Sequence, residues 1–170
     1  INLEGIGLVG AKPEQAPKRM AKWLDELRTP PVMRAYASLD EVAARLQKTN
    51  PRLPTERAAF LAEHWSARND AGEYEILGDP AHKMPGPLLY HLDEVIAMWK
   101  RISAPVLWIE AAQTEMWRWM GLQEEMRAEV DRRLAHMASV EPHIVAEAGH
   151  MVHHDQPEVL ARLIEAFLAK

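Results

Sequence analysis

Cysteine is absent from the 170 residues of the chain, so disulfide bonds, thiolate nucleophiles and cysteine-ligated metal sites are excluded. No apolar run is long enough to cross a bilayer, which argues against a membrane partner. Basic side chains do not dominate: the formal net charge is −5, which gives a nucleic-acid partner no electrostatic support. These absences are compatible with the cytoplasm, where we expect the protein to reside.

The chain has enough apolar sequence to bury a core. Hydrophobic residues occupy 48% of the 170 positions, and this length alone suggests one domain. Apolar spacing and helix-start signals predict helices over residues 12–27, 39–49, 55–65, 93–101 and 123–137. Ser38 followed by Glu41 predicts a capping box before the second helix, and Thr55 is a candidate cap for the third. A short strand is predicted at 74–77, inside an otherwise irregular stretch.

Strands are predicted near both ends of the chain. The run from Ala104 to Ile109 is continuously apolar and has a proline as its second residue, as is typical of a parallel strand covered on both faces. The run from His143 to Ala146 is too short for a helix and predicts a second strand. Residues 1–3 resemble the end of a strand whose backbone groups need a neighbour, so we expect a longer protein.

A histidine follows the last predicted strand at the point where the chain turns. The stretch Glu147-Ala148-Gly149-His150 leads towards Pro157, which suits the first turn of a helix. The helix that follows places one apolar face on Val159, Leu160, Leu163, Ile164, Phe167 and Leu168. A loop histidine can present one ring nitrogen to a cleft while a carboxylate holds the other. His150 is therefore a candidate general base.

The stretch from residue 105 to the C-terminus resembles the last part of the α/β-hydrolase fold, where a strand, a Gly-His pair and a helix follow one another. Gly149, His150 and Pro157 match that pattern. The resemblance implies an α/β fold in which parallel strands are flanked by helices and a helical cap is inserted. It implies the end of a core strand and its exit loop at residues 1–10, a helical cap at 11–101 and the C-terminal part of the α/β core at 102–170. It also implies that His150 is the catalytic base.

The acid that should orient this base is missing from its usual place. The family has Gly and Asp after the strand that resembles 104–109, and this sequence has Ala111 and Thr114 there. Three carboxylates could take over. Glu4 follows the first strand, from which relatives such as haloalkane dehalogenases take their acid, and it is our first choice. Glu115 is the second, and Glu110, at the strand end, has a less predictable orientation.

The sequence contains no Gly-x-Ser-x-Gly nucleophile elbow. In the family the nucleophile and the oxyanion hole precede the strand at which this chain starts. We therefore expect a C-terminal fragment that is not competent alone and whose partner is an N-terminal part of the same protein. The implied activity is hydrolysis of a small apolar ester by a serine nucleophile. The alternative is an Asp nucleophile that opens an epoxide or a carbon–halogen bond.

Three other interpretations remain open. The missing acid and nucleophile favour a non-catalytic α/β domain that binds a partner or an apolar ligand through Trp and Met side chains. His150 could be a loop histidine without a role. With His153, His154 and Asp155 it could also ligate a metal ion, although Pro157 predicts that the helix starts after this cluster.

Cofactors and metals are not expected, and a homodimer is left open. Trp117, Trp119 and Met120 could line an acyl pocket, but we expect them to pack in the core.

Overall fold

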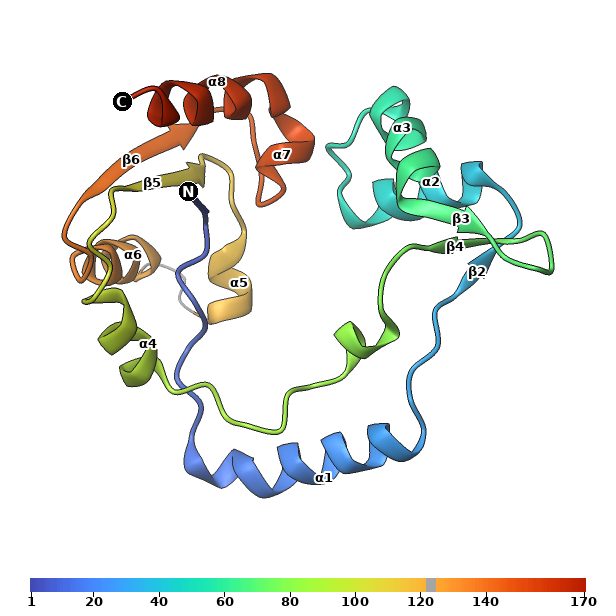
Figure 1. The fold of residues 1–170 in the computed structure, drawn as a ribbon, viewed down its shortest axis with the longest axis horizontal. Helices are drawn as coiled ribbons and strands as arrows, with labels where there is room; N and C mark the ends of the chain where they lie inside the picture. Colours follow the sequence, from blue (N-terminus) through green and yellow to red (C-terminus); the bar gives the residue numbers. More distant parts are fainter. Residues whose placement is uncertain (122–124) are drawn as a thin grey trace. The chain divides into compact units, whose positions relative to one another are not determined.

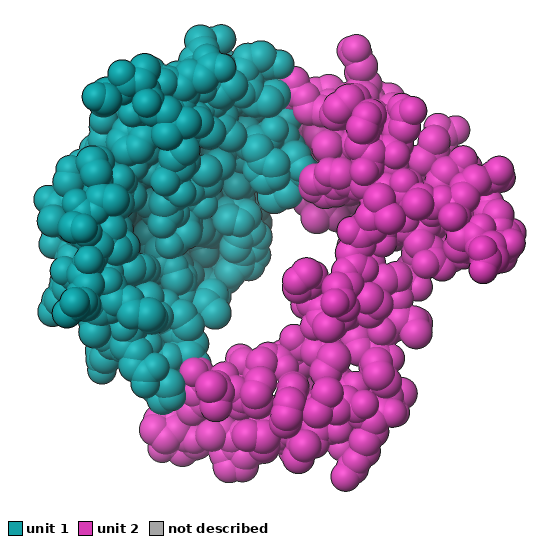
Figure 2. Space-filling view, viewed as in Figure 1, with its two compact units in different colours: residues 1–11, 90–170 teal, residues 12–89 magenta. Residues whose placement is uncertain are grey.

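The computed structural model describes residues 1–121 and 125–170, which form two compact units. Unit 1 consists of residues 1–11 and 90–170, and unit 2 of residues 12–89 (Figure 2). The three-segment division drawn from the sequence stays a prediction. No helix among the described residues is long and apolar enough to cross a membrane.

Unit 1 is built on a three-stranded parallel sheet (Figure 1). The strands β1 (Asn2–Leu3), β5 (Val106–Ala111) and β6 (Val140–Val145) lie in the order β1-β5-β6. Asn2 pairs with Trp108, and Val106 pairs with Val140. The central strand is covered on both faces, since Leu107, Trp108 and Ile109 are at most 1% exposed. This burial explains the continuous apolar run and confirms the predicted α/β class with parallel strands flanked by helices.

Five helices of the described residues belong to unit 1: α4 (Leu92–Trp99), α5 (Met116–Met120), α6 (Met126–Leu134), α7 (Val152–Asp155) and α8 (Pro157–Leu168). Alternation along β5 sends its side chains to two cores. Trp108 packs on one face with methionines of α5 and α6, together with Val130 and Leu134. Leu107 and Ile109 pack on the other face with Val152 and with Leu160 of α8.

The predicted C-terminal elements are largely confirmed. Helix α8 begins at Pro157, and its apolar face packs on the sheet except for Leu168, which is 70% exposed. The helix predicted over 123–137 is α6, whose predicted start at Gln123 lies outside the described residues. The short helices α5 and α7 were not predicted, because four or five residues do not establish a 3.6-residue periodicity.

Unit 2 combines helices with a small antiparallel sheet. Its elements are a 3-10 turn (Pro13–Gln15), α1 (Ala16–Arg28), β2 (Ala35–Tyr36), α2 (Leu39–Thr49), α3 (Thr55–Trp65), β3 (Ser66–Arg68), β4 (Tyr74–Ile76) and a second 3-10 turn (Pro80–Lys83). The strand order is β2-β4-β3. The three predicted helices and the strand at 74–77 are confirmed. Ser66 directly follows α3 and begins β3, a strand that was not predicted.

A side-chain hydrogen bond caps the start of α2, whereas the N-cap of α3 has none. Ser38 Oγ accepts a hydrogen bond from Glu41 N at 3.2 Å, as the capping box predicts. The Glu41 carboxylate accepts from Ala37 N, one residue before the expected donor. The predicted cap at Thr55 is wrong by one position: Pro54 is the N-cap, and Thr55 is the first helical residue.

Candidate active site

The candidate site lies at one edge of the parallel sheet of unit 1. Glu4 follows β1, Thr114 follows β5 and His150 follows β6. Because the three strands are parallel, their carboxyl ends meet at the same edge, where open α/β sheets bind their ligands. Residues far apart in the sequence therefore gather in one place.

The structure joins His150 to Glu4. The imidazole Nδ1 lies 2.7 Å from Glu4 Oε2, and the Glu4 side chain is completely buried while 37% of the His150 side chain is exposed. With the proton on Nδ1, the imidazole donates to the carboxylate and keeps the lone pair on Nε2. His150 thus has one nitrogen held by an acid and an exposed ring, which is the arrangement that a general base requires.

Two further donors hold the Glu4 carboxylate: one is the last residue of β5 and the other lies in the loop that follows it. Ala111 N donates to Oε1 at 2.7 Å, and Thr114 Oγ1 donates to Oε2 at 3.0 Å. A buried carboxylate is costly unless its oxygens accept such hydrogen bonds. Thr114 stands where the resemblance led us to expect an acid, and here it donates to the carboxylate that follows β1. No sequence pattern indicates this role, except that a residue with a hydroxyl group occupies the position.

The backbone around Glu4 turns sharply. Glu4 has φ +52°, a left-handed conformation that is uncommon for a residue other than glycine. Glu4 N donates to Ile109 O at 3.0 Å, and Asn2 Oδ1 accepts from Gly5 N at 2.7 Å. These contacts extend the pairing with β5 by one residue and then reverse the chain. They aim the Glu4 side chain across the end of β5.

A buried ion pair anchors the segment that follows Glu4. Arg133 and Glu129 of α6 form this pair with side chains that are 3% and 8% exposed. Arg133 Nη1 also donates to Ile6 O at 2.7 Å and to Leu8 O at 3.0 Å. Burial lowers the pKa of the Arg133 guanidinium. Arg133 is therefore a link between α6 and the strand exit that carries Glu4. A charge-rich helix is typical of a solvated face, so the sequence alone does not indicate this role.

The loop that carries His150 is fixed by its own contacts. Gly149 N donates to Asp155 Oδ2 at 2.7 Å, and Gln113 N donates to Ala148 O at 3.0 Å. The first contact ties the loop to α7, and the second ties it to the chain after β5. The imidazole is thus presented by a backbone that is held on both sides.

The other two candidate acids are not brought to His150. Glu115 forms an ion pair with Arg118 at 2.8 Å and is largely exposed. Glu110 lies on the face of Trp108, whose Nε1 donates to it at 3.2 Å, and it pairs with Arg127 at 2.8 Å. Glu110 points to this face because residues two apart in a strand share a side of the sheet.

An exposed indole contacts the candidate base. The rings of Trp119 and His150 lie edge to face with centroids 4.8 Å apart, and Trp119 is 68% exposed. The expectation that Trp119 packs in the core is therefore wrong. Trp117 and Met120, in contrast, contribute to the core around Trp108. Helix α5 places Trp119 on the side of the His150 ring.

The histidine-rich stretch does not form a metal site in the described part of the chain, where no group of three or more His, Cys, Asp or Glu side chains is arranged to hold an ion. His154 is buried. Partial burial lowers the pKa of the neighbouring His153, His150 lowers it further and Asp155 acts in the opposite direction. Helix α8 starts after the cluster, as Pro157 predicts, but the short helix α7 also spans 152–155 and was not predicted.

Comparisons with known proteins place the fold. No protein-family model matches the sequence, and no curated protein matches it. Solved structures do. A hypothetical protein from Pseudomonas aeruginosa PAO1 has a TM-score of 0.75 at 22% identity, with 96% of this chain and 57% of that chain covered. The thioesterase domain from the curacin biosynthetic pathway has a TM-score of 0.71 at 21% identity, with 92% and 54% covered.

An esterase from Mycobacterium tuberculosis gives a TM-score of 0.64 at 18% identity, with 92% of this chain and 48% of that chain covered. The chain thus spans about half the length of the structures that it matches. These similarities agree with the parallel sheet, with the helices that flank it and with the position of His150 after β6. The chain has the α/β-hydrolase fold.

Proposed function

We propose that the protein is a hydrolase in which His150 is the general base and Glu4 is the acid that orients it. The observation that carries this proposal is the 2.7 Å contact between His150 Nδ1 and the buried Glu4 carboxylate. An acid on Nδ1 fixes the tautomer in which Nε2 accepts a proton, and it stabilises the imidazolium that then forms.

The nucleophile comes from a part of the protein outside this sequence. The 170 residues contain no Gly-x-Ser-x-Gly elbow, and the similar structures are about twice as long. His150 Nε2 takes the proton of the nucleophile hydroxyl while the oxygen attacks the ester carbonyl. The protonated imidazole then gives this proton to the leaving alcohol, and an acyl-enzyme remains. Water, deprotonated by the same imidazole, hydrolyses the acyl-enzyme and regenerates the hydroxyl.

Ester or thioester hydrolysis of a small apolar substrate is the favoured reaction. Two of the similar structures carry the names esterase and thioesterase domain. The exposed Trp119 beside His150 offers an apolar surface next to the reacting groups.

A second candidate reaction uses an aspartate nucleophile and opens an epoxide or a carbon–halogen bond. The observation that favours it is the origin of the acid. Glu4 comes from the end of β1, which corresponds to the strand that supplies the acid in haloalkane dehalogenases. In that reaction His150 would deprotonate the water that hydrolyses the ester intermediate.

The test uses the full-length protein with three substrate classes. The ester is p-nitrophenyl butyrate, the thioester is a butyryl thioester, and an epoxide and a bromoalkane, assayed separately, represent the second reaction. We expect ester or thioester turnover, and its loss in His150→Gln. His153→Gln, three residues away in the same stretch, is the matched control and should retain turnover. Full activity of His150→Gln would refute the assigned base. Turnover of only the epoxide or bromoalkane would select the second reaction, and no turnover with any substrate would favour a binding domain.

A further inference from the structure

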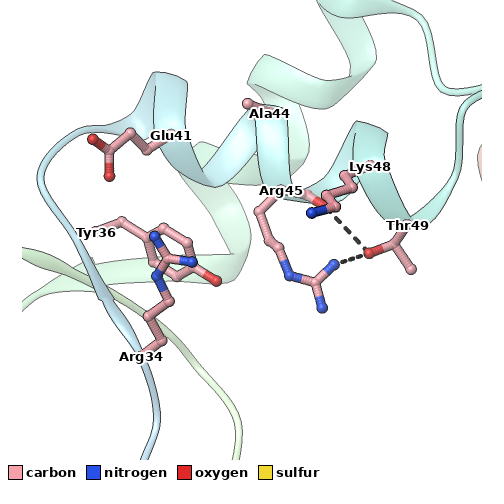
Figure 3. Close-up of a pocket in the computed structure, with 7 residues that line it drawn as sticks. All are labelled: Arg34, Tyr36, Glu41, Ala44, Arg45, Lys48 and Thr49. Carbon is pink, nitrogen blue, oxygen red and sulfur yellow. Dashed lines mark hydrogen bonds between the residues drawn. The ribbon is translucent and has the colours of Figure 1, made fainter.

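Three basic side chains line one hollow of unit 2. Arg34 precedes β2, and Arg45 and Lys48 lie one turn apart on α2. Together with Tyr36, Glu41, Ala44 and Thr49 they line a cavity of about 550 Å³ (Figure 3). Figure 3 shows Arg45 and Lys48 on the helix and Arg34 on the strand side, across from them. Two elements therefore present cations to the same space.

Two of these guanidinium groups are held in place before any ligand arrives. The Arg34 guanidinium lies over the Tyr36 ring, 5.0 Å from its centroid, and the Tyr36 side chain is buried. Arg45 Nη1 donates a hydrogen bond to Thr49 Oγ1, and the Thr49 hydroxyl donates to the backbone Arg45 O at 3.1 Å. Side chains that are already oriented lose less conformational entropy when they bind.

The positive charge of this hollow exceeds its negative charge, because three cations share it with a single carboxylate, that of Glu41. No ion pair joins Arg34, Arg45 or Lys48 to a carboxylate of residues 1–121 or 125–170. Glu41 is the acidic residue of the lining, and its carboxylate accepts from Ala37 N at the start of α2. In unit 1, by contrast, Arg118, Arg127, Arg132 and Arg133 each pair with a carboxylate.

We propose that the hollow lined by Arg34, Arg45 and Lys48 binds the phosphate group of a small-molecule ligand. Two guanidinium forks and one ammonium match the oxygens of a phosphate, which guanidinium binds with paired hydrogen bonds. A monocarboxylate brings one negative charge, whereas a phosphate brings about two near pH 7 and therefore balances more of the three positive charges. The phosphate can be free or part of a monoester, and both sources share this chemistry. The site is independent of the proposed reaction, since it uses none of its residues.

The experiment titrates the full-length protein with inorganic phosphate and, separately, with methyl phosphate, at constant ionic strength set with sodium chloride. Backbone and arginine side-chain NMR signals report binding. We expect saturable shifts centred on Arg34, Arg45 and Lys48. Arg45→Gln should raise the dissociation constant about tenfold or more, because a hydrogen bond to a charged group is lost. Lys48→Gln should act in the same direction.

The matched control is Lys18→Gln, which removes the same charge from an exposed position on α1 of the same unit and should bind phosphate like the unmodified protein. The side chains of Arg45, Lys48 and Lys18 are exposed. Their glutamine variants should therefore keep the unfolding midpoint of the unmodified protein, which circular dichroism measures. Arg34→Gln is the second variant if one of the others unfolds. Tighter binding of methyl phosphate than of inorganic phosphate would identify a monoester ligand.

Three outcomes would overturn the proposal. The first is a linear response that never saturates. The second is equal weakening in Lys18→Gln. The third is a much tighter, strongly salt-dependent complex with a short single-stranded DNA, which would identify a nucleic-acid surface. His150→Gln should bind phosphate normally, so failure of the hydrolase proposal and failure of this one are distinguishable.

Discussion

Glu4 Oε2 and His150 Nδ1 lie 2.7 Å apart although 146 positions separate the two residues. In the sheet order β1-β5-β6, Glu4 and His150 follow the two outer strands, and the end of β5 lies between them. The two residues meet above this end, where Ala111 N and Thr114 Oγ1 donate to the same carboxylate. The pair therefore depends on the sheet and on three strand exits rather than on any local sequence spacing.

Glu4→Gln should release the imidazole of His150 from its fixed tautomer. The amide keeps the shape of the side chain but lacks the negative charge that accepts strongly from Nδ1–H. A hydrogen bond of this kind gives a far-downfield Nδ1 proton signal, which should be present in the unmodified protein and absent in the variant. Under the proposed function, turnover by the full-length protein should fall by roughly 10⁴-fold, as on loss of the acid from a Ser-His-Asp triad.

Glu115→Gln is the control for that experiment, because Glu115 pairs with Arg118 and not with His150. The Glu115→Gln variant should show the same downfield Nδ1 proton signal of His150 and the same turnover as the unmodified protein. Loss of the signal in Glu115→Gln and its survival in Glu4→Gln would reverse the assignment of the acid.

Thr114→Val should destabilise the chain and loosen the carboxylate without removing it. Valine has the shape of threonine but cannot donate to Glu4 Oε2, so one of the three donors to a buried charge is lost. A hydrogen bond to a charged group contributes about 1.5–3 kcal/mol, and the free energy of unfolding in urea should fall by about that amount. Thr114→Ser keeps the hydroxyl and should recover most of the loss. Equal stability of the two variants would contradict the assigned role.

The sequence predicts the elements with strong periodicity, and it predicts much of the candidate site. Helix α8, the strand β5 and the position of His150 follow from an amphipathic face, a continuous apolar run and a Gly-His turn before proline. Glu4 could be ranked first among the carboxylates because the first residues resemble a strand end. Its partner atoms could not be predicted, since Ala111 N and Thr114 Oγ1 reach it only through the parallel pairing of β1 with β5.

The features that the sequence does not predict are short secondary-structure elements and polar contacts between residues far apart in the chain. The strands β2 and β3 have two and three residues, too few to show a two-residue alternation. Trp119 belongs to a five-residue helix, so its exposure beside His150 had no periodic signal. Arg133 lies in a charge-rich helix where most charged side chains face solvent, and only the structure shows that its guanidinium is buried against Ile6 O and Leu8 O.

Arg133→Met should be among the most destabilising single changes in unit 1. It leaves the buried Glu129 with the exposed Arg132 as its remaining ion-pair partner and frees the carbonyls of Ile6 and Leu8. Breaking a buried ion pair from one side costs about 3–5 kcal/mol. The double variant Glu129→Leu with Arg133→Met removes both charges and should recover a large part of that loss. Urea unfolding of the two single variants and the double variant measures the coupling, and simple additivity would contradict a buried pair.

Acid should destabilise unit 1 partly through His153. Partial burial, and then the nearby His150, lower the pKa of His153 below its ordinary value of 6.5, against the opposing effect of Asp155. The folded chain therefore binds this proton less readily than the unfolded chain does. The free energy of unfolding consequently falls as the pH drops from about 6.5 to the lowered pKa of His153 in the folded chain. Above pH 6.5 this group does not affect it. His153→Gln removes the effect, so the variant should gain stability relative to the unmodified protein as the pH falls. Urea unfolding of both proteins across pH 7.5 to 5 measures the difference, and a gap that stays constant over this range would disprove the contribution of His153.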